Sequence, residues 1–220
     1  MNRHIKAVFF DLDGTLVDTA PDLGAAANRI RQSAGLPPLP LIDYRPVASS
    51  GARGLLGKAL GITPEHVDFP RHRDALLGHY RAHLADHSTL FKGMAELLRY
   101  IEQHNMRWGV VTNKPAWLTR PLIRALALDQ SAACVVSADE VGQPKPAPDS
   151  LLLGCALSSI APQDCLYVGD DVRDIVAGRA AGMITVAAAW GYIGNTPLHT
   201  WGADLIFDTP SDLQYWLESR

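Results

Sequence analysis

The arrangement of apolar residues is the feature that most constrains how this chain can fold. Six short runs rich in β-branched or aromatic residues alternate with longer segments that have helical spacing. These runs are Ile5–Phe10, Trp108–Thr112, Cys134–Ser137, Leu166–Gly169, Ile184–Ala188 and Leu205–Phe207. Because consecutive positions are apolar, each run is typical of a strand buried on both faces. The pattern predicts an α/β fold with a Rossmann-like, doubly wound parallel sheet.

Helical spacing fills the segments between these runs, and the alternation is regular from about residue 107 onward. The helices predicted there and just before are Gly93–His104, Ala116–Ala127, Pro148–Leu157, Val172–Ala181 and Ser211–Glu218. Between the first run and Gly93 the rhythm breaks, since three helical segments follow one another without a convincing strand. These are Ala20–Ala34, Ala52–Leu60 and Phe69–His87. The sequence thus predicts a helical cap domain inserted after the first strand.

The predicted boundaries are residues 1–17 and 89–220 for the catalytic core and 18–88 for the cap. Ligands of doubly wound sheets bind beyond the carboxyl ends of the strands. An insert that leaves the chain just after the first strand is therefore expected to cover that edge as a lid.

Composition limits the partners. The 220 residues carry a formal net charge of −3 with acids and bases spread along the chain, so we expect neither nucleic acid nor a membrane surface as a partner. The three cysteines form no CxxC pair, which favours reduced thiols. The apolar run near the N-terminus is short for a signal peptide, and no stretch is long enough to span a membrane. We expect a cytoplasmic protein, whose oligomeric state the sequence leaves open.

Polar residues with useful chemistry follow the first predicted strand directly. Asp11 and Asp13 lie one residue apart, where two carboxylates can converge on one cation. Gly14 allows a sharp turn, and Thr15 offers a hydroxyl and an amide to an anion. A metal ion and a phosphate group could share this corner of the sheet.

Four segments, in this order, resemble the four motifs of the haloacid-dehalogenase-like hydrolases. They are Asp11–Thr15, Val110–Lys114, Gly142–Asp149 and Val168–Asp174. A single motif of this kind could be an ordinary turn or helix cap, but here each of the four lies near the end of a predicted strand. The continuation Leu16–Thr19 is similar to the form found in phosphatases with a helical cap. The resemblance extends over the whole chain.

The resemblance implies phosphate transfer to a carboxylate. Asp11 would attack phosphorus to give an aspartyl phosphate, and Asp13 would protonate the leaving oxygen and then activate water. Thr112 and Asn113 would bind phosphate oxygens. Lys145 would stabilise both the nucleophile and the phosphoryl charge.

The same resemblance implies a magnesium site. Asp170 would bind Mg²⁺ together with Asp11 and Asp13, while Asp171 and Asp174 are candidates to orient the metal's waters. Oxygen ligands with an open position suit Mg²⁺ better than zinc. Since a phosphate dianion repels a carboxylate nucleophile, the site needs a cation on each side, which Mg²⁺ and a lysine would provide.

The expected substrate is a small phosphomonoester. Five segments resemble phosphatases that act on N-acetylmuramic acid 6-phosphate in peptidoglycan recycling, with those acting on 2-phosphoglycolate as the alternative. The segments are Gly35–Pro38, Ser50–Arg53, Trp108–Pro115, Gly191–Ile193 and Trp201–Asp204. A sugar phosphomutase of the same superfamily also remains open, because it would share the nucleophile, the acid/base residue and the cap.

Two features of the predicted cap could bind ligands. Arg53 begins a predicted cap helix, from which a guanidinium could recognise an anionic or hydroxylated substrate. His79, His83 and His87 are spaced by four residues and could line one helix face. Solvated helix residues are the better interpretation of these histidines, because no cysteine or acidic cluster completes a metal site.

Overall fold

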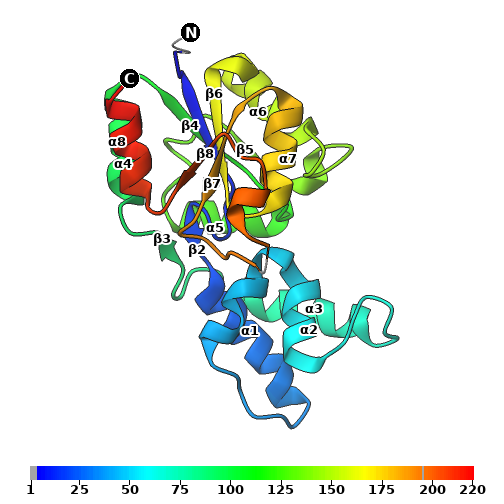
Figure 1. Cartoon of the computed structure of the whole chain (residues 1–220). Coiled ribbons are helices and arrows are strands. Elements are labelled where there is room, and N and C mark those ends of the chain that lie inside the picture. Colours follow the sequence, from blue (N-terminus) through cyan, green and yellow to red (C-terminus); the bar gives the residue numbers. More distant parts are fainter. Residues whose placement is uncertain (1–3, 195) are drawn as a thin grey trace.

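A parallel sheet forms the centre of the computed structural model, which describes residues 4–194 and 196–220. The sheet has six strands in the order β5-β4-β1-β6-β7-β8, and Figure 1 labels them. The strands are β1 (Ala7–Phe10), β4 (Arg107–Val111), β5 (Val135–Val136), β6 (Cys165–Gly169), β7 (Ile184–Ala188) and β8 (Leu205–Phe207). All six runs predicted from the sequence form strands, and the α/β Rossmann-like fold is confirmed.

Helices cover both faces of the sheet because side chains alternate along each strand. From β1, Val8 and Phe10 point into an apolar core with α4, α5 and α8, whereas Ala7 and Phe9 face α6 and α7. These helices are α4 (Met94–Gln103), α5 (Ala116–Ala125), α6 (Asp149–Ser158), α7 (Val172–Ala181) and α8 (Pro210–Glu218). Every strand residue of β1 is fully buried, which explains its uninterrupted apolar sequence.

Three further helices form a separate bundle below the sheet in Figure 1. They are α1 (Ala20–Ser33), α2 (Gly51–Leu60) and α3 (Phe69–Ala82). The bundle has its own apolar core, which includes Leu23, Leu55, Leu76 and Tyr80. Two-residue antiparallel strands, β2 (Val17–Asp18) and β3 (Thr89–Leu90), lie where the chain enters and leaves the bundle. The sequence did not predict these strands, because two residues are too few to show a period.

The third helix of the bundle is shorter than predicted. It ends at Ala82, with His83 as its C-cap, rather than continuing to His87. The His87 backbone N–H instead donates to the carboxylate of Asp22, and the His83 ring contacts Asp86 at 2.7 Å. The expectation that the three histidines share one helix face is therefore wrong. None of the helices in the described part of the chain is long and apolar enough to cross a membrane.

Candidate active site

Asp11 lies directly after β1 at the centre of the carboxyl edge of the sheet. Its backbone N–H donates to the carbonyl of Val168 at 2.9 Å, which extends the pairing of β1 with β6. Its Oδ1 accepts from the backbone N–H of Leu12 at 2.8 Å and lies 3.0 Å from the Lys145 ammonium. These contacts fix the orientation of a carboxylate that still reaches the cavity at this edge.

Asp170 and Asp174 complete an acidic cluster with Asp11. One carboxylate oxygen from each lies within 4.8 Å of the others, and all three residues are buried. Burial, followed by the charges of Asp11 and Asp174, raises the pKa of Asp170 to about 8. Burial likewise raises the pKa of Asp174 to about 6, although the Lys145 ammonium opposes the rise. Three carboxylates beside one ammonium leave an excess of negative charge, and this oxygen donor set fits a divalent cation such as Mg²⁺.

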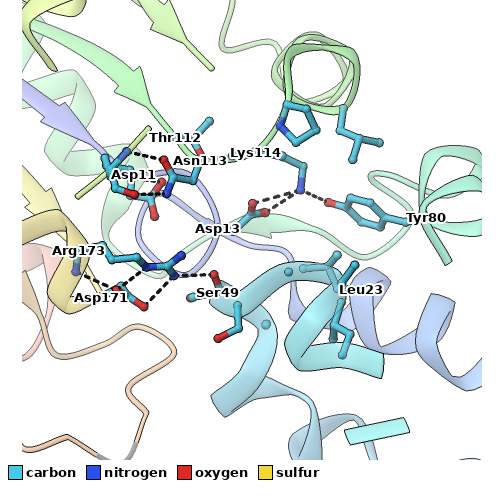
Figure 2. Close-up of a pocket in the computed structure, with 18 of the residues that line it drawn as sticks. Asp11, Asp13, Leu23, Ser49, Tyr80, Thr112, Asn113, Lys114, Asp171 and Arg173 are labelled. Atoms are coloured by element: carbon cyan, nitrogen blue, oxygen red, sulfur yellow. Dashed lines mark hydrogen bonds and ion pairs between the residues drawn. The ribbon is translucent and has the colours of Figure 1, made fainter. Parts of the chain in front are cut away.

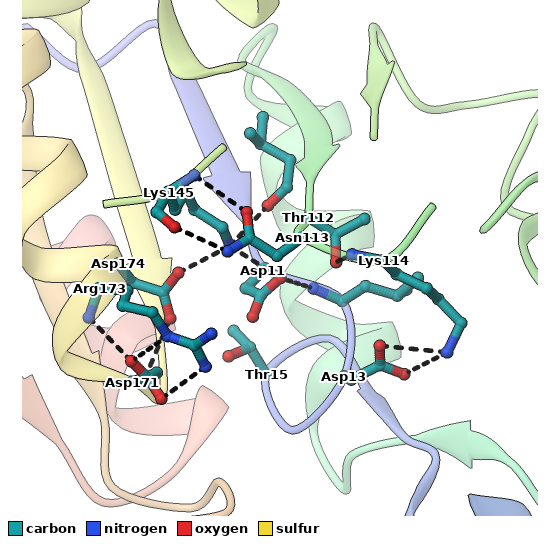
Figure 3. A network of polar contacts seen from close by, with 12 residues as sticks. Asp11, Asp13, Thr15, Thr112, Asn113, Lys114, Lys145, Asp171, Arg173 and Asp174 are labelled. Atoms are coloured by element: carbon teal, nitrogen blue, oxygen red, sulfur yellow. Dashed lines mark hydrogen bonds and ion pairs between the residues drawn. The ribbon is translucent and has the colours of Figure 1, made fainter. Parts of the chain in front are cut away.

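Lys145 is the ammonium that faces the cluster, as Figure 3 shows. Its Nζ lies 2.7 Å from Asp174 Oδ1 and donates to the hydroxyl of Tyr167 at 2.7 Å. Its backbone is fixed by the Asn113 side chain, which donates to the Lys145 carbonyl at 2.8 Å and accepts from its N–H at 3.0 Å. Asn113 also lines the cavity, so its expected contact with phosphate stays a prediction, while its side-chain amide holds the lysine loop. Thr112 lies beside it at the cavity wall.

The carboxylate of Asp13 lies apart from the other acids. Its oxygens accept from Lys114 Nζ at 2.9 and 3.1 Å and from the Thr19 hydroxyl at 2.6 Å. An extended chain would place Asp13 on the same side as Asp11, but the chain turns at once, and the Leu16 N–H donates to the Asp11 carbonyl at 3.2 Å. The structure therefore does not bring this carboxylate into the acidic cluster, which contains Asp174 instead, and Asp13 is held by an ammonium.

Asp171 acts at the start of α7. Its side chain accepts from the Arg173 backbone N–H at 2.9 Å as an N-cap, and its two oxygens contact the Arg173 guanidinium at 2.8 and 2.9 Å. The guanidinium also donates to the carbonyl of Ser49 at 2.9 Å, which links the sheet edge to the helical bundle (Figure 2). Asp171 therefore orders the helix start that carries Asp174.

Arg53 does not reach the cavity. Along α2, Ala52 lines the cavity and Leu55, Leu56 and Ala59 are buried, whereas Arg53 is exposed. Successive residues of a helix are rotated by about 100°, so the residue after Ala52 points away from the wall. The prediction that Arg53 contacts substrate is not supported by this placement.

The cavity has a volume of about 270 Å³ and two kinds of wall. Figure 2 shows the polar groups at the sheet edge and the helical bundle closing the other side. The bundle and α5 contribute mainly apolar side chains: Leu23, Leu55, Leu76, Leu77 and Leu118. Sequence reasoning missed this wall and also Lys114 and Tyr80, which line the cavity.

Stability without metal is expected to fall as pH rises. Asp170 titrates near 4 when unfolded but its pKa is raised to about 8 in the folded state. The folded state thus binds more protons than the unfolded state between these values, and the free energy of unfolding decreases across them. In EDTA, thermal melting should give a lower Tm at about pH 8 than at about pH 5. Mg²⁺ should raise the Tm most at the higher pH, and a Tm that Mg²⁺ leaves unchanged at both would contradict a cation site.

The neighbours of Gly14 leave no room for a side chain at this position. Its φ is +87°, and a Cβ built there would lie 2.2 Å from Asp170 Oδ2 and 2.7 Å from the Tyr192 ring. Gly14→Ala should therefore displace Asp170 and lower the free energy of unfolding by about 2–4 kcal/mol, from strain and the clash together. Gly35 has a φ of +70° and nothing within 4 Å, so Gly35→Ala should cost only about 1 kcal/mol. Chemical denaturation of both variants measures the difference in the free energy of unfolding, and equal losses would contradict a clash between residue 14 and its neighbours.

Comparison with known proteins agrees with this geometry. A family model described as haloacid dehalogenase-like hydrolase matches residues 8–188. The chain is 42% identical to an N-acetylmuramic acid 6-phosphate phosphatase of Pseudomonas putida, covering 98% of this chain and 97% of the relative. It is 41% identical to a phosphoglycolate phosphatase of Xanthomonas campestris, covering 96% of each. A crystal structure of a predicted phosphoglycolate phosphatase from Haemophilus somnus superposes with a TM-score of 0.84 at 27% identity, covering 96% and 97% of the two chains. This chain belongs to the haloacid dehalogenase-like hydrolase family.

Proposed function

We propose that this enzyme is a Mg²⁺-dependent phosphatase that hydrolyses N-acetylmuramic acid 6-phosphate through an aspartyl phosphate on Asp11, in peptidoglycan recycling. The observation that carries the chemistry is the buried cluster of Asp11, Asp170 and Asp174 with the ammonium of Lys145 beside it. Phosphatase activity on a small phosphorylated metabolite is also the activity named for the relatives of this chain.

In the proposed first step, a carboxylate oxygen of Asp11 attacks phosphorus, and the bond from phosphorus to the ester oxygen breaks. Asp13, protonated at the start of this step, donates its proton to the departing alcohol and becomes a carboxylate. In the second step, Asp13 takes a proton from water, which attacks phosphorus, releasing inorganic phosphate and restoring Asp11. Lys145 offsets the negative charge between nucleophile and phosphate. Asp11, Asp170 and Asp174 would hold Mg²⁺, which supplies positive charge to the phosphate oxygens.

The shape of the cavity supports a substrate larger than a two-carbon acid. A volume of about 270 Å³ behind the reactive groups has room for a sugar. The leucine side chains of the wall suit the methyl groups of an acetamido and a lactyl substituent. 2-Phosphoglycolate is the alternative substrate, because the Xanthomonas campestris relative carries that activity in its name.

A phosphomutase is less well supported. Its bisphosphorylated intermediate needs a second cationic subsite. Among the described residues that line the cavity, the cations are Lys114, Lys145 and Arg173, and each already contacts a carboxylate. Hydrolysis rather than phosphate transfer within a sugar is the activity that this arrangement favours.

The proposed domain division follows the two apolar cores. Residues 18–88 would form the cap, since α1, α2 and α3 pack mainly with one another, and residues 1–17 and 89–220 would form the catalytic core. The short β2–β3 pair lies at both boundaries, where a change of backbone angle would move the cap as a unit.

A phosphate-release screen tests the proposal. Purified protein is assayed with N-acetylmuramic acid 6-phosphate, N-acetylglucosamine 6-phosphate, glucose 6-phosphate and 2-phosphoglycolate, each with Mg²⁺ and with EDTA. We expect the highest kcat/KM for N-acetylmuramic acid 6-phosphate and little release in EDTA. A higher kcat/KM for 2-phosphoglycolate would contradict the substrate assignment, and release in EDTA at the same rate would contradict the metal requirement.

A further inference from the structure

A buried lysine and tyrosine outside the proposed proton and phosphate transfers contact the carboxylate of Asp13. Lys114 Nζ donates to the two Asp13 oxygens at 2.9 and 3.1 Å and to the Tyr80 hydroxyl at 2.9 Å. An ammonium has three N–H groups, and these contacts use all of them. Figure 2 shows the three side chains in line, from the sheet edge to α3. Lys114 is thus committed to Asp13 rather than available to a phosphate.

The backbone of Lys114 is fixed on the core side. Its N–H donates to the Thr112 hydroxyl at 3.1 Å, and its carbonyl accepts from the Thr119 hydroxyl at 3.1 Å. Pro115 follows as the N-cap of α5. The Lys114 side chain is only 5% exposed, so few rotamers are open to it. A lysine held in this way presents its ammonium at a defined point and can orient a carboxylate at little further entropic cost.

Tyr80 connects the helical bundle to the ion pair of Lys114 and Asp13. It lies on α3, is fully buried, and its ring centre is 4.4 Å from Lys114 Nζ. The ammonium therefore gains both a hydrogen bond and a cation–π contact from the bundle. Both contacts exist only while α3 packs against the edge of the sheet where Lys114 lies.

We propose that Lys114 is a positioning residue that orients the carboxylate of Asp13 for proton transfer, and that Tyr80 makes this orientation depend on the packing of α3. The inference rests on the proposed role of Asp13 as general acid. The Thr19 hydroxyl, 2.6 Å from Asp13 Oδ1, holds the carboxylate from a second side. Removing Lys114 leaves this single neutral contact, which allows the carboxylate to rotate away from the leaving oxygen.

Esters with different leaving groups separate positioning from a merely structural role. Phenyl phosphate needs protonation of its leaving oxygen, whereas para-nitrophenyl phosphate leaves as a stable anion without much help. We expect Lys114→Met to lower kcat/KM about 100-fold for phenyl phosphate and less than about 10-fold for para-nitrophenyl phosphate. The difference between the two losses corresponds to the rate enhancement that general acid catalysis supplies. Tyr80→Phe should raise the ratio of kcat/KM for para-nitrophenyl phosphate to kcat/KM for phenyl phosphate by about 3-fold to 10-fold. Lys114→Arg should recover part of the activity toward phenyl phosphate that Lys114→Met loses.

Tyr44→Phe is the matched control. Tyr44 is also fully buried in the helical bundle, and its hydroxyl donates to Asn28 Oδ1 at 2.9 Å, away from the cavity. This variant should change kcat/KM for both esters by the same factor. If Lys114→Met also slows both esters equally, the positioning role is overturned.

Asp13→Asn distinguishes failure of the positioning role of Lys114 from failure of the general-acid role of Asp13. If it slows phenyl phosphate selectively while Lys114→Met does not, the positioning role fails and the proposed mechanism stands. If Asp13→Asn slows both esters by the same factor, its role as general acid fails, and the positioning role fails with it.

Discussion

Asp11→Asn is expected to lower kcat by about 10⁴-fold or more, the order of loss seen when a catalytic nucleophile is removed. An amide oxygen is a poor nucleophile toward phosphorus, and its phosphorylated form is not a stable ester. The substitution keeps the size of the side chain and the Oδ1 acceptor that the Leu12 N–H contacts at 2.8 Å. The fold should therefore persist, and kcat for a good phosphomonoester measures the effect.

Binding and stability measurements separate lost chemistry from lost structure in this variant. Lys145 keeps its contact with Asp174 at 2.7 Å in this variant, and only one of three clustered negative charges is removed. The Tm of Asp11→Asn should therefore stay within a few degrees of the unmutated value, and isothermal titration with Mg²⁺ and substrate should still give binding. Asp129 is exposed and lies outside the cavity, so Asp129→Asn is the matched control and should leave kcat unchanged. Unmutated turnover in Asp11→Asn would contradict the assignment of the nucleophile.

Lys145→Met is expected to affect both activity and stability. The side chain is only 2% exposed and contacts the carboxylates of Asp11 and Asp174. Removing one member of a buried ionic network leaves the others uncompensated, which typically costs about 3–5 kcal/mol. The loss of one electrostatic contact to the transition state should also lower kcat by about 10²-fold to 10³-fold. Urea denaturation and steady-state kinetics measure the two effects.

An exposed lysine provides the control for the stability effect. Lys6 Nζ lies 2.8 Å from Asp164 Oδ2, but its side chain is 55% exposed. Lys6→Met should therefore cost less than about 1 kcal/mol. Mg²⁺ should recover part of the stability of Lys145→Met, because the cation offsets the unpaired carboxylates. A cost for Lys145→Met as small as that for Lys6→Met would contradict the network.

The sheet could be predicted from the sequence because its central strands are buried on both faces. The run Ala7–Phe10, for example, is apolar throughout, and each of the six predicted runs overlaps a strand. Local spacing failed where tertiary contacts decide the structure. Helical spacing continues past Ala82, but the helix ends there. The backbone N–H groups of His87 and Ser88 donate instead to the carboxylate of Asp22, which is sixty-five residues from His87 in the sequence.

In the candidate site, too, the positions that follow from the sheet topology could be predicted, whereas the orientations set by distant side chains could not. Asp11, Lys145 and Asp170 follow strands whose carboxyl ends meet at one edge, so their proximity follows from the topology. The orientation of Asp13 depends on an ammonium 101 residues away, which no local pattern reveals. The sequence indicates that Arg53 lies near the start of a cap helix but not which face of that helix meets the cavity, and a shift of one residue rotates a side chain by about 100°.

Trapping the phosphorylated enzyme would identify the residue that receives the phosphate from the substrate. The protein is mixed with a labelled phosphomonoester and Mg²⁺, quenched in acid within milliseconds, digested, and mapped by mass spectrometry. We expect an acid-stable, hydroxylamine-sensitive phosphate on the peptide that contains Asp11, and none on the same peptide of Asp11→Asn. Label on any other residue, or rapid phosphate release without covalent label at any quench time, would contradict this expectation.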